Sequence, residues 1–213
     1  MRAEPRDPSQ SGDDKGNARQ MPLLRFLAVS VLLVLAGCQQ PPPQQRLPEL
    51  SFAGQPPIQL NIGRIEVVTQ YQPPLRAPNI EHQMPVSPAA AMQRWAQDRL
   101  RPLGRDGSAR LIIRDAKVTE TRLKTDSGFT GMFKEQPSER YDAVLDVVFQ
   151  VLDDRQFMIA EAQAQATRSR GVLEGISVNE RERIWYEMVK QLSDDVGAQL
   201  DANIKTYMQR WLM

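Results

Sequence analysis

Apolar and polar residues alternate in several stretches of the chain, beginning with Ile58, Leu60 and Ile62. Successive side chains of a strand point to opposite faces of a sheet, so this period of two predicts β-strands. The first strand carries a glycine, Gly63, which is typical of a β-bulge. Four strands are expected, over residues 58–67, 109–123, 141–151 and 156–167.

A helical period appears first after Ser87-Pro88, an N-cap residue followed by proline at the first helical position. Apolar residues then recur at spacings of three and four. Pro102 lacks the N–H that would continue the helical hydrogen bonds, so this helix is expected to end near Arg101.

A second helix is predicted from the capping box Ser177–Glu180, and it carries an apolar residue at every fourth position from Ile184 to Leu212. Four residues turn a helix by about 400°, so such a stripe drifts by about 40° at each step. We therefore expect a bend or break near Gly197, or a helix that wraps around the sheet.

The predicted order β-α-β-β-β-α gives an α/β (α+β) fold, a two-layer sandwich of two helices on a four-stranded sheet. It forms a single globular domain over residues 58–213. The strand over residues 156–167 has alanine at every second position, from Ala160 to Ala166. Two interpretations remain open for this face: a close approach of a helix, or room for an apolar ligand.

Residues 1–20 are polar and lack apolar periodicity, which predicts a disordered extension or a wrongly assigned start before Met21. Residues 21–37 combine Arg25 with an uncharged apolar run from Phe26 to Ala36. A helix that spans a bilayer needs roughly 20 apolar residues, so this shorter run indicates a signal peptide.

The run ends in Leu35-Ala36-Gly37-Cys38, a lipobox, and here the chain resembles a bacterial lipoprotein precursor. The resemblance implies cleavage between Gly37 and Cys38 and a covalent lipid on the Cys38 sulfur. It also implies attachment to a membrane of the cell envelope. Gln39 follows the cysteine, and by resemblance to enterobacterial lipoproteins this favours the periplasmic face of the outer membrane, with the inner membrane as the alternative. The other interpretation of Cys38 is a buried free cysteine in a short hydrophobic helix.

Residues 38–57 are rich in proline and glutamine, which is typical of an extended polyproline II spacer. A ligand segment for a proline-recognising domain is the alternative. The order of elements after the lipobox resembles that of small outer-membrane lipoproteins that assist envelope transport. Examples are the lipoprotein plug of the lipopolysaccharide-assembly barrel and the ABC-type transport auxiliary lipoproteins. This resemblance rests on element order alone.

Composition excludes several classes of function. The chain has 27 basic and 26 acidic side chains, of which residues 1–37 contain five and four. The remainder is therefore formally neutral. A neutral charge balance argues against nucleic acid as a partner. A single cysteine forbids an internal disulfide, and His82 has no metal-ligand spacing around it. The sequence contains no nucleophile elbow and no phosphate-binding glycine loop. Glu161 is interpreted as a carboxylate on the solvated face of a strand. We expect neither catalysis nor a cofactor other than the covalent lipid.

The predicted loop over residues 124–140 is the first candidate interaction site, with Phe129, Met132 and Phe133 set among glycines. These side chains either anchor a partner or fold back to seal an edge of the sandwich. A second candidate is the proline-rich loop over residues 71–85, which otherwise serves as a stiff crossover. A third is formed by residues of the C-terminal helix that lie off its stripe and either widen the core or make an oligomer contact: Trp185, Val189, Tyr207 and Trp211.

Two hypotheses of function follow. The first is a non-catalytic accessory lipoprotein that binds an envelope protein through the loop over residues 124–140 or through an open edge of the sheet. The second is a lipoprotein that binds a small ligand or lipid in an apolar pocket between sheet and helices. Neither the identity of the partner nor the oligomeric state follows from the sequence.

Overall fold

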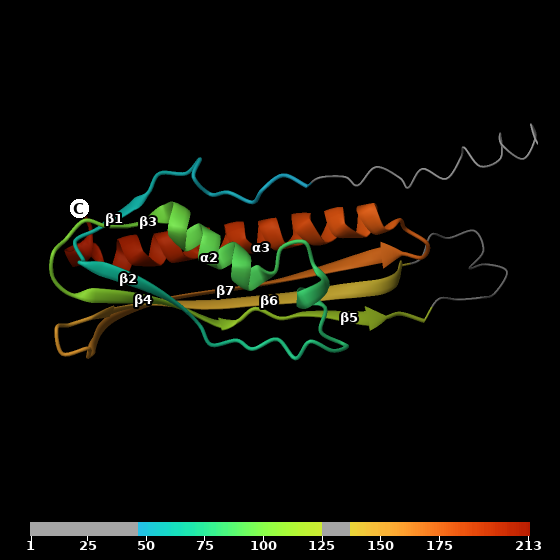
Figure 1. The fold of residues 1–213 in the computed structure, drawn as a ribbon, viewed down its shortest axis with the longest axis horizontal. Coiled ribbons are helices and arrows are strands. Elements are labelled where there is room, and N and C mark those ends of the chain that lie inside the picture. The colour runs from blue at the N-terminus through green and yellow to red at the C-terminus, as the bar shows by residue number, and fades with distance from the viewer. Residues whose placement is uncertain (1–46, 125–136) are drawn as a thin grey trace, which may run out of the picture. The chain divides into compact units, whose positions relative to one another are not determined.

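The computed structural model describes residues 47–124 and 137–213. Two α-helices, α2 (Pro88–Arg99) and α3 (Val178–Tyr207), cover one face of a five-stranded mixed sheet (Figure 1). The predicted class, a two-layer α/β sandwich, is confirmed. Two helices on one face bury that face and leave the other face of the sheet to solvent.

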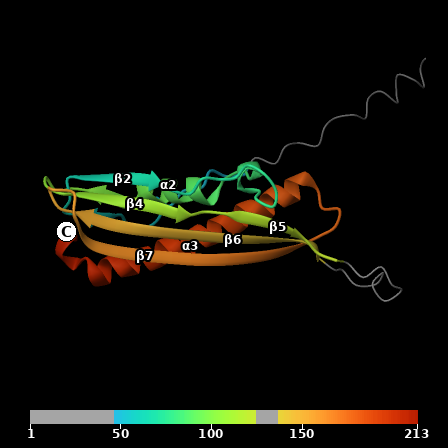
Figure 2. The same ribbon diagram turned by 90° about the horizontal axis from the view of Figure 1, so that it is seen from below.

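The longest strands form a hairpin at the centre of the sheet. β6 pairs with β7 along one edge, while β4 and β5 pair with successive parts of its other edge, and β2 lies parallel to β4 (Figure 2). β2, β5 and β7 each pair with one strand of this sheet, so each has an edge without a strand partner among the described residues. The strands of this sheet are β2 (Arg64–Thr69), β4 (Ser108–Asp115), β5 (Val118–Arg122), β6 (Pro137–Leu152) and β7 (Met158–Leu173).

The first predicted strand is in fact two strands in different sheets. β1 (Ile58–Leu60) pairs in parallel with β3 (Leu100–Pro102), and β2 begins only after Gly63. A Cβ atom at Gly63 would lie 2.6 Å from the Arg105 carbonyl oxygen, so the chain passes close beneath a neighbouring loop at this point. The glycine therefore marks a break between sheets where the sequence predicted a bulge within one strand.

The second predicted strand is also divided, because β4 and β5 are separated at residues 116–117. The Asp115 carboxylate accepts hydrogen bonds from the Lys117 backbone N–H at 3.2 Å and from its Nζ at 2.9 Å, which fixes this irregularity. The sheet consequently has five strands where the sequence predicted four.

The β6–β7 hairpin has the predicted turn at Asp153, whose backbone N–H donates to the Phe157 carbonyl at 2.9 Å. Both strands are longer than predicted. β6 begins at Pro137, so residues 137–140 of the predicted loop belong to a strand, and β7 extends to Leu173.

Both predicted N-caps are confirmed. Ser87 Oγ accepts from the Ala90 N–H, and Ser177 Oγ accepts from the Glu180 N–H, each at 3.2 Å. α3 then continues for 30 residues without a break at Gly197. A Cβ atom at Gly197 would lie 2.3 Å from Trp95 Nε1, so this glycine serves the contact between α3 and α2.

The core lies between the sheet and the helices and extends further toward the N-terminus than predicted. Leu50 and Phe52 are 5% and 3% exposed, and the Phe52 N–H donates to the Asp98 carboxylate at 2.8 Å. The predicted spacer over residues 38–57 is therefore too long at its C-terminal end, because two apolar residues within it are buried.

Candidate interaction surfaces

Several predicted site residues lie outside the described residues. These are the lipidation and cleavage positions Cys38 and Gly37, and the loop residues Phe129, Met132 and Phe133. The lipobox and the loop therefore remain predictions from the sequence.

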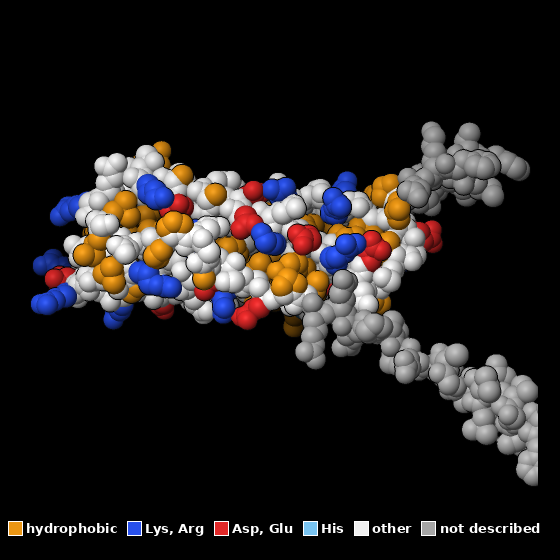
Figure 3. Space-filling view, turned by 90° about the horizontal axis from the view of Figure 1, so that it is seen from above, with side chains coloured by type: hydrophobic (Ala, Val, Ile, Leu, Met, Phe, Trp, Pro, Cys, Tyr) orange, Lys and Arg blue, Asp and Glu red, His pale blue; other side chains and the backbone are white. Residues whose placement is uncertain are grey.

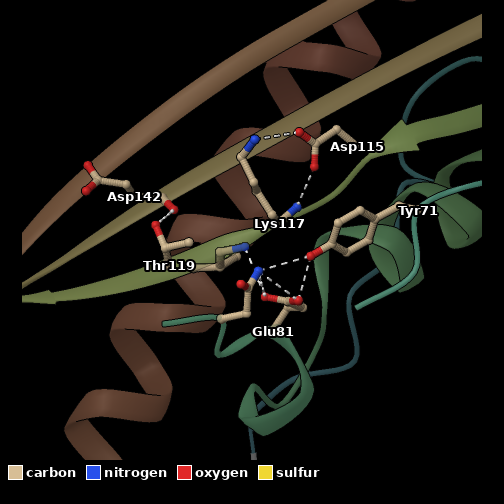
Figure 4. Close-up of polar contacts among 8 residues, drawn as sticks. Tyr71, Glu81, Asp115, Lys117, Thr119 and Asp142 are labelled. Atoms are coloured by element: carbon tan, nitrogen blue, oxygen red, sulfur yellow. Dashed lines mark hydrogen bonds and ion pairs between the residues drawn. The ribbon is translucent and has the colours of Figure 1, made fainter. Parts of the chain in front are cut away.

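The crossover between β2 and α2 contains a buried carboxylate, Glu81, which is 3% exposed (Figure 4). One of its oxygens accepts from the Tyr71 hydroxyl at 2.6 Å, and the other accepts from the Val118 backbone N–H at 3.2 Å. Asn79 Nδ2 also donates to Glu81, at 3.3 Å. Glu81 therefore ties the crossover to the start of β5 through both carboxylate oxygens.

This cluster changes the acidity of its phenol. Burial, the hydrogen bond to Glu81 and the negative charge of Glu81 raise the pKa of the Tyr71 hydroxyl above its ordinary value. Tyr71 therefore stays protonated and continues to donate to Glu81. Because both carboxylate oxygens are already satisfied, the arrangement fits a structural clamp better than a general base.

A groove of about 430 Å³ lies beside this clamp and is lined by Tyr71, Glu81, His82 and the first turn of α2. His82 is exposed and its ring nitrogen lies 3.3 Å from Gln83 Nε2. Within the described ranges, no three His, Cys, Asp or Glu side chains are grouped so that they could hold a metal ion. None of the helices in this part of the chain is long and apolar enough to cross a bilayer.

The off-stripe residues of α3 have different environments. Trp185 and Val189 are buried, and the Trp185 ring packs edge-on against Tyr141 at 5.6 Å between centroids, so these residues widen the core. Tyr207 is exposed, and Trp211, which follows α3, is half-buried. Glu161 lies on the solvent face of the sheet and accepts from Gln150 Nε2 at 2.8 Å, as its position on a solvated face predicts.

The free edge of β7 is the most extensive candidate surface. The Val144 N–H donates to the Lys117 carbonyl, so even-numbered residues of β6 direct their backbone groups toward β5 and β4. The odd-numbered residues of β6 therefore exchange backbone hydrogen bonds with the even-numbered residues of β7 that lie opposite them. It follows that the N–H and C=O groups of odd-numbered residues, such as Gln165, Thr167 and Ser169, point away from the sheet.

One carbonyl on this edge has a partner, because Asn203 Nδ2 of α3 donates to the Gln163 oxygen at 2.6 Å. Among the described residues, the backbone groups of Gln165, Thr167 and Ser169 that face outward have no hydrogen bond. An unpaired edge of this kind accepts an additional strand. Alternating residues predicted β7, but its position at the edge follows from topology that the sequence pattern does not contain.

The space above the alanines is occupied by α3. Ala162 and Ala164 are each 3% exposed, which confirms that the alanines allow a close approach of a helix.

Farther along β7, a hollow of about 500 Å³ opens between the strand and α3 and is lined largely by charged side chains, including Arg168, Arg170 and Glu187. Its polar lining does not resemble the apolar pocket expected of a lipid-binding protein.

Comparison with known proteins gives only distant structural similarity. No family model matches the chain, and no curated protein sequence matches it. The chain is similar to a minor lipoprotein from Acinetobacter baumannii, with 14% identity, a TM-score of 0.37, and coverage of 70% of this chain and 93% of that chain. It is also similar to rare lipoprotein B from Shewanella oneidensis, with 11% identity, a TM-score of 0.36, and coverage of 67% and 94%. For a putative lipoprotein from Caulobacter crescentus the identity is 12%, the TM-score 0.28, and the coverage 65% and 90%. Similarities this weak assign the chain to no family.

Proposed function

We propose that the protein is a lipid-anchored, non-catalytic accessory component of the bacterial envelope that binds a partner protein by strand addition to β7. The lipobox ending at Cys38 supports the anchor. The observation that supports the binding mode is the outward-facing, unpaired backbone of β7 from Gln165 to Ser169. Strand addition uses main-chain hydrogen bonds and requires no catalytic group.

The anchor limits where the partner can lie. Because Leu50 is already part of the core, the spacer from Gln39 to Leu50 reaches about 40 Å at full extension. The domain therefore remains close to the membrane that holds Cys38, and a partner embedded in that membrane meets β7 at high effective concentration.

A proline at Thr167 tests the binding mode. The Thr167 N–H faces outward, so Thr167→Pro removes a donor from the free edge without removing a bond to β6. Thr167→Ala is the matched control, because it removes the same side chain and keeps the N–H. After extraction in mild detergent, we expect co-purification of an envelope protein with the wild type and Thr167→Ala, and its loss with Thr167→Pro at unchanged melting temperature.

The outcomes separate the two parts of the proposal. A partner retained by a well-folded Thr167→Pro variant would show that binding does not use this edge. If neither the anchored protein nor the Cys38→Ala variant retains any partner, the accessory role itself loses its support. Mass spectrometry of the N-terminal peptide tests the lipid on Cys38 independently.

Placement at the periplasmic face of the outer membrane is the finer part of this proposal and rests on Gln39. Separation of inner and outer membranes on a density gradient tests it. Recovery of the wild type in the outer-membrane fraction is expected, together with a shift toward the inner membrane for Gln39→Asp. Equal distribution of both proteins would contradict a sorting role for this position.

A further inference from the structure

One end of the packed unit exposes apolar side chains far more than the rest. This hairpin end is formed by the loop over residues 103–107, the turn over residues 153–159 and the last residues of the chain (Figure 1). Within the described part of the chain, six of the ten exposed large hydrophobic side chains lie here. They are Leu103, Phe157, Met158, Ile159, Tyr207 and Met213, each 52–70% exposed.

The turn presents its apolar residues on a fixed backbone. The Asp153 carboxylate accepts from the backbone N–H groups of Arg155 at 2.9 Å and Phe157 at 2.8 Å. Gln156 has a φ of 67° and its Nε2 donates to Ser108 Oγ at 3.2 Å, which ties the turn to β4. The three consecutive exposed residues that follow are therefore held in place before any partner arrives.

Basic side chains gather at this end beside hydrophobic ones, with acidic side chains among them, as the left end of Figure 3 shows. Arg64 and Arg105 line a shallow hollow of about 310 Å³ together with Asp153 and Asp154 of the turn. Among the described residues, neither has an ion-pair partner, and neither does Arg155. Among the described residues, the charged groups of this end outside ion pairs are five arginines, three aspartates, one glutamate and the carboxylate of the last residue: Arg64, Arg101, Arg105, Arg155, Arg210, Asp106, Asp153, Asp154, Glu161 and Met213.

Arg110 pairs with Glu66 at this end, and Asp201 pairs with both Arg99 and Lys205, so these ion pairs leave one positive charge. The hairpin end therefore carries a small basic excess, and Arg64, Arg105 and Arg155 lie beside its apolar residues without an ion-pair partner among the described residues. Exposed aromatic and aliphatic side chains beside unpaired arginines match the interfacial region of a bilayer that contains anionic lipid.

We propose that the hairpin end docks on the surface of an anionic bilayer, with Phe157 and Ile159 inserted among the headgroups and Arg105 and Arg155 near lipid phosphates. This inference rests on the proposed anchor only for proximity, because the spacer keeps the domain near a bilayer. The contact gives the tethered domain a second attachment to the membrane and limits the orientations that it adopts there.

Vesicle flotation of the chain from Gln39, without lipid, tests the docking. All core residues lie between Leu50 and Met208, so this chain retains the complete packed unit. The probes are vesicles of phosphatidylcholine with about one third phosphatidylglycerol, and vesicles of phosphatidylcholine alone. We expect the wild type to float with the anionic vesicles, and to do so less at high salt.

Two variants and two matched controls test which side chains of the hairpin end contact the vesicles. Phe157→Ser with Ile159→Ser is expected to lower the partition coefficient about tenfold, and Arg105→Gln with Arg155→Gln about tenfold on anionic vesicles only. The controls are Leu75→Ser with Val178→Ser, which replace exposed apolar residues elsewhere, and Arg122→Gln, and both should float like the wild type. Circular dichroism confirms that each variant is folded.

Two results would overturn the proposal. The first is a wild type that floats no better with anionic vesicles than without vesicles, and the second is an equal loss of flotation in the control variants. Loss of a co-purifying protein from Phe157→Ser with Ile159→Ser, without any vesicle binding by the wild type, would identify the hairpin end as a protein contact. None of these results depends on Thr167→Pro, so strand addition at β7 is judged separately.

Discussion

β6 and β7 are neighbouring strands of 16 residues each, yet they have different roles in the sandwich. β6 pairs along both edges and directs large side chains into the core, such as Tyr141, Leu145 and Phe149, all 0% exposed. β7 pairs along one edge and places Ala162 and Ala164 beneath α3. The difference shows that one strand fills the core, while the other sets the distance of a helix and has outward-facing backbone groups without a partner among the described residues.

Removal of a large side chain from β6 should give the largest loss of stability. Phe149→Ala is expected to lower the free energy of unfolding by about 3–5 kcal/mol, because it leaves a cavity beneath the helices. Urea denaturation measures this loss. Gln150→Ala, one residue along and on the solvent face, is the control and should cost less than about 0.5 kcal/mol. Equal effects of the two substitutions would contradict the assignment of faces on β6.

An enlarged side chain on β7 should have the next largest effect. Ala164→Leu is expected to cost about 1–3 kcal/mol, since the added atoms must displace α3 from the sheet. The matched control is Gln165→Leu, which places the same side chain on the opposite face of the strand. A stabilised Ala164→Leu variant would show instead that the alanines leave space beneath the helix.

The faces of these strands could be predicted from the sequence because burial follows the period of two in the residues themselves. The helix caps Ser87 and Ser177 were predictable for the same reason, since capping depends on neighbouring residues. The edge of β7 and the break at Gly63 were not, because both depend on which distant segment lies alongside. Glu81 was also missed: its burial results from a contact with Val118, far along the chain and invisible to local periodicity.

On the side of β6 that faces away from β7, a polar contact of Glu81 ties β5 to the crossover before α2. Glu81→Gln should weaken this contact. The substitution keeps the shape of the side chain, removes its charge and replaces one carboxylate oxygen with an NH2 group, so the side chain cannot accept from both the Tyr71 hydroxyl and the Val118 N–H. We expect a loss of about 1–2 kcal/mol in urea denaturation. Glu120→Gln is the control for loss of a carboxylate on β5, because the Glu120 side chain accepts no hydrogen bond from the described residues. An unchanged Glu81→Gln variant would mean that the clamp is not needed to hold β5 against the crossover.

The smallest expected effect concerns a polar contact between β6 and β7 themselves. Ser169 Oγ on β7 donates to the Asp142 carboxylate on β6 at 2.5 Å. This hydrogen bond, opposed by partial burial and assisted by Arg140, lowers the pKa of Asp142. A lowered pKa in the folded state stabilises the fold above the ordinary aspartate pKa, and this contribution disappears as the pH falls through the folded value.

Ser169→Ala should therefore raise the pKa of Asp142 toward its ordinary value. It should lower stability at pH 7 while leaving stability nearly unchanged in strong acid, where Asp142 is protonated in both states. NMR titration of the Asp142 carboxyl carbon measures the first effect, and urea denaturation at the two pH values measures the second. Asp142 is partly exposed, so solvent screening keeps the change in stability small. A larger loss in acid than at pH 7 would show that Ser169 stabilises the hairpin through contacts other than this hydrogen bond.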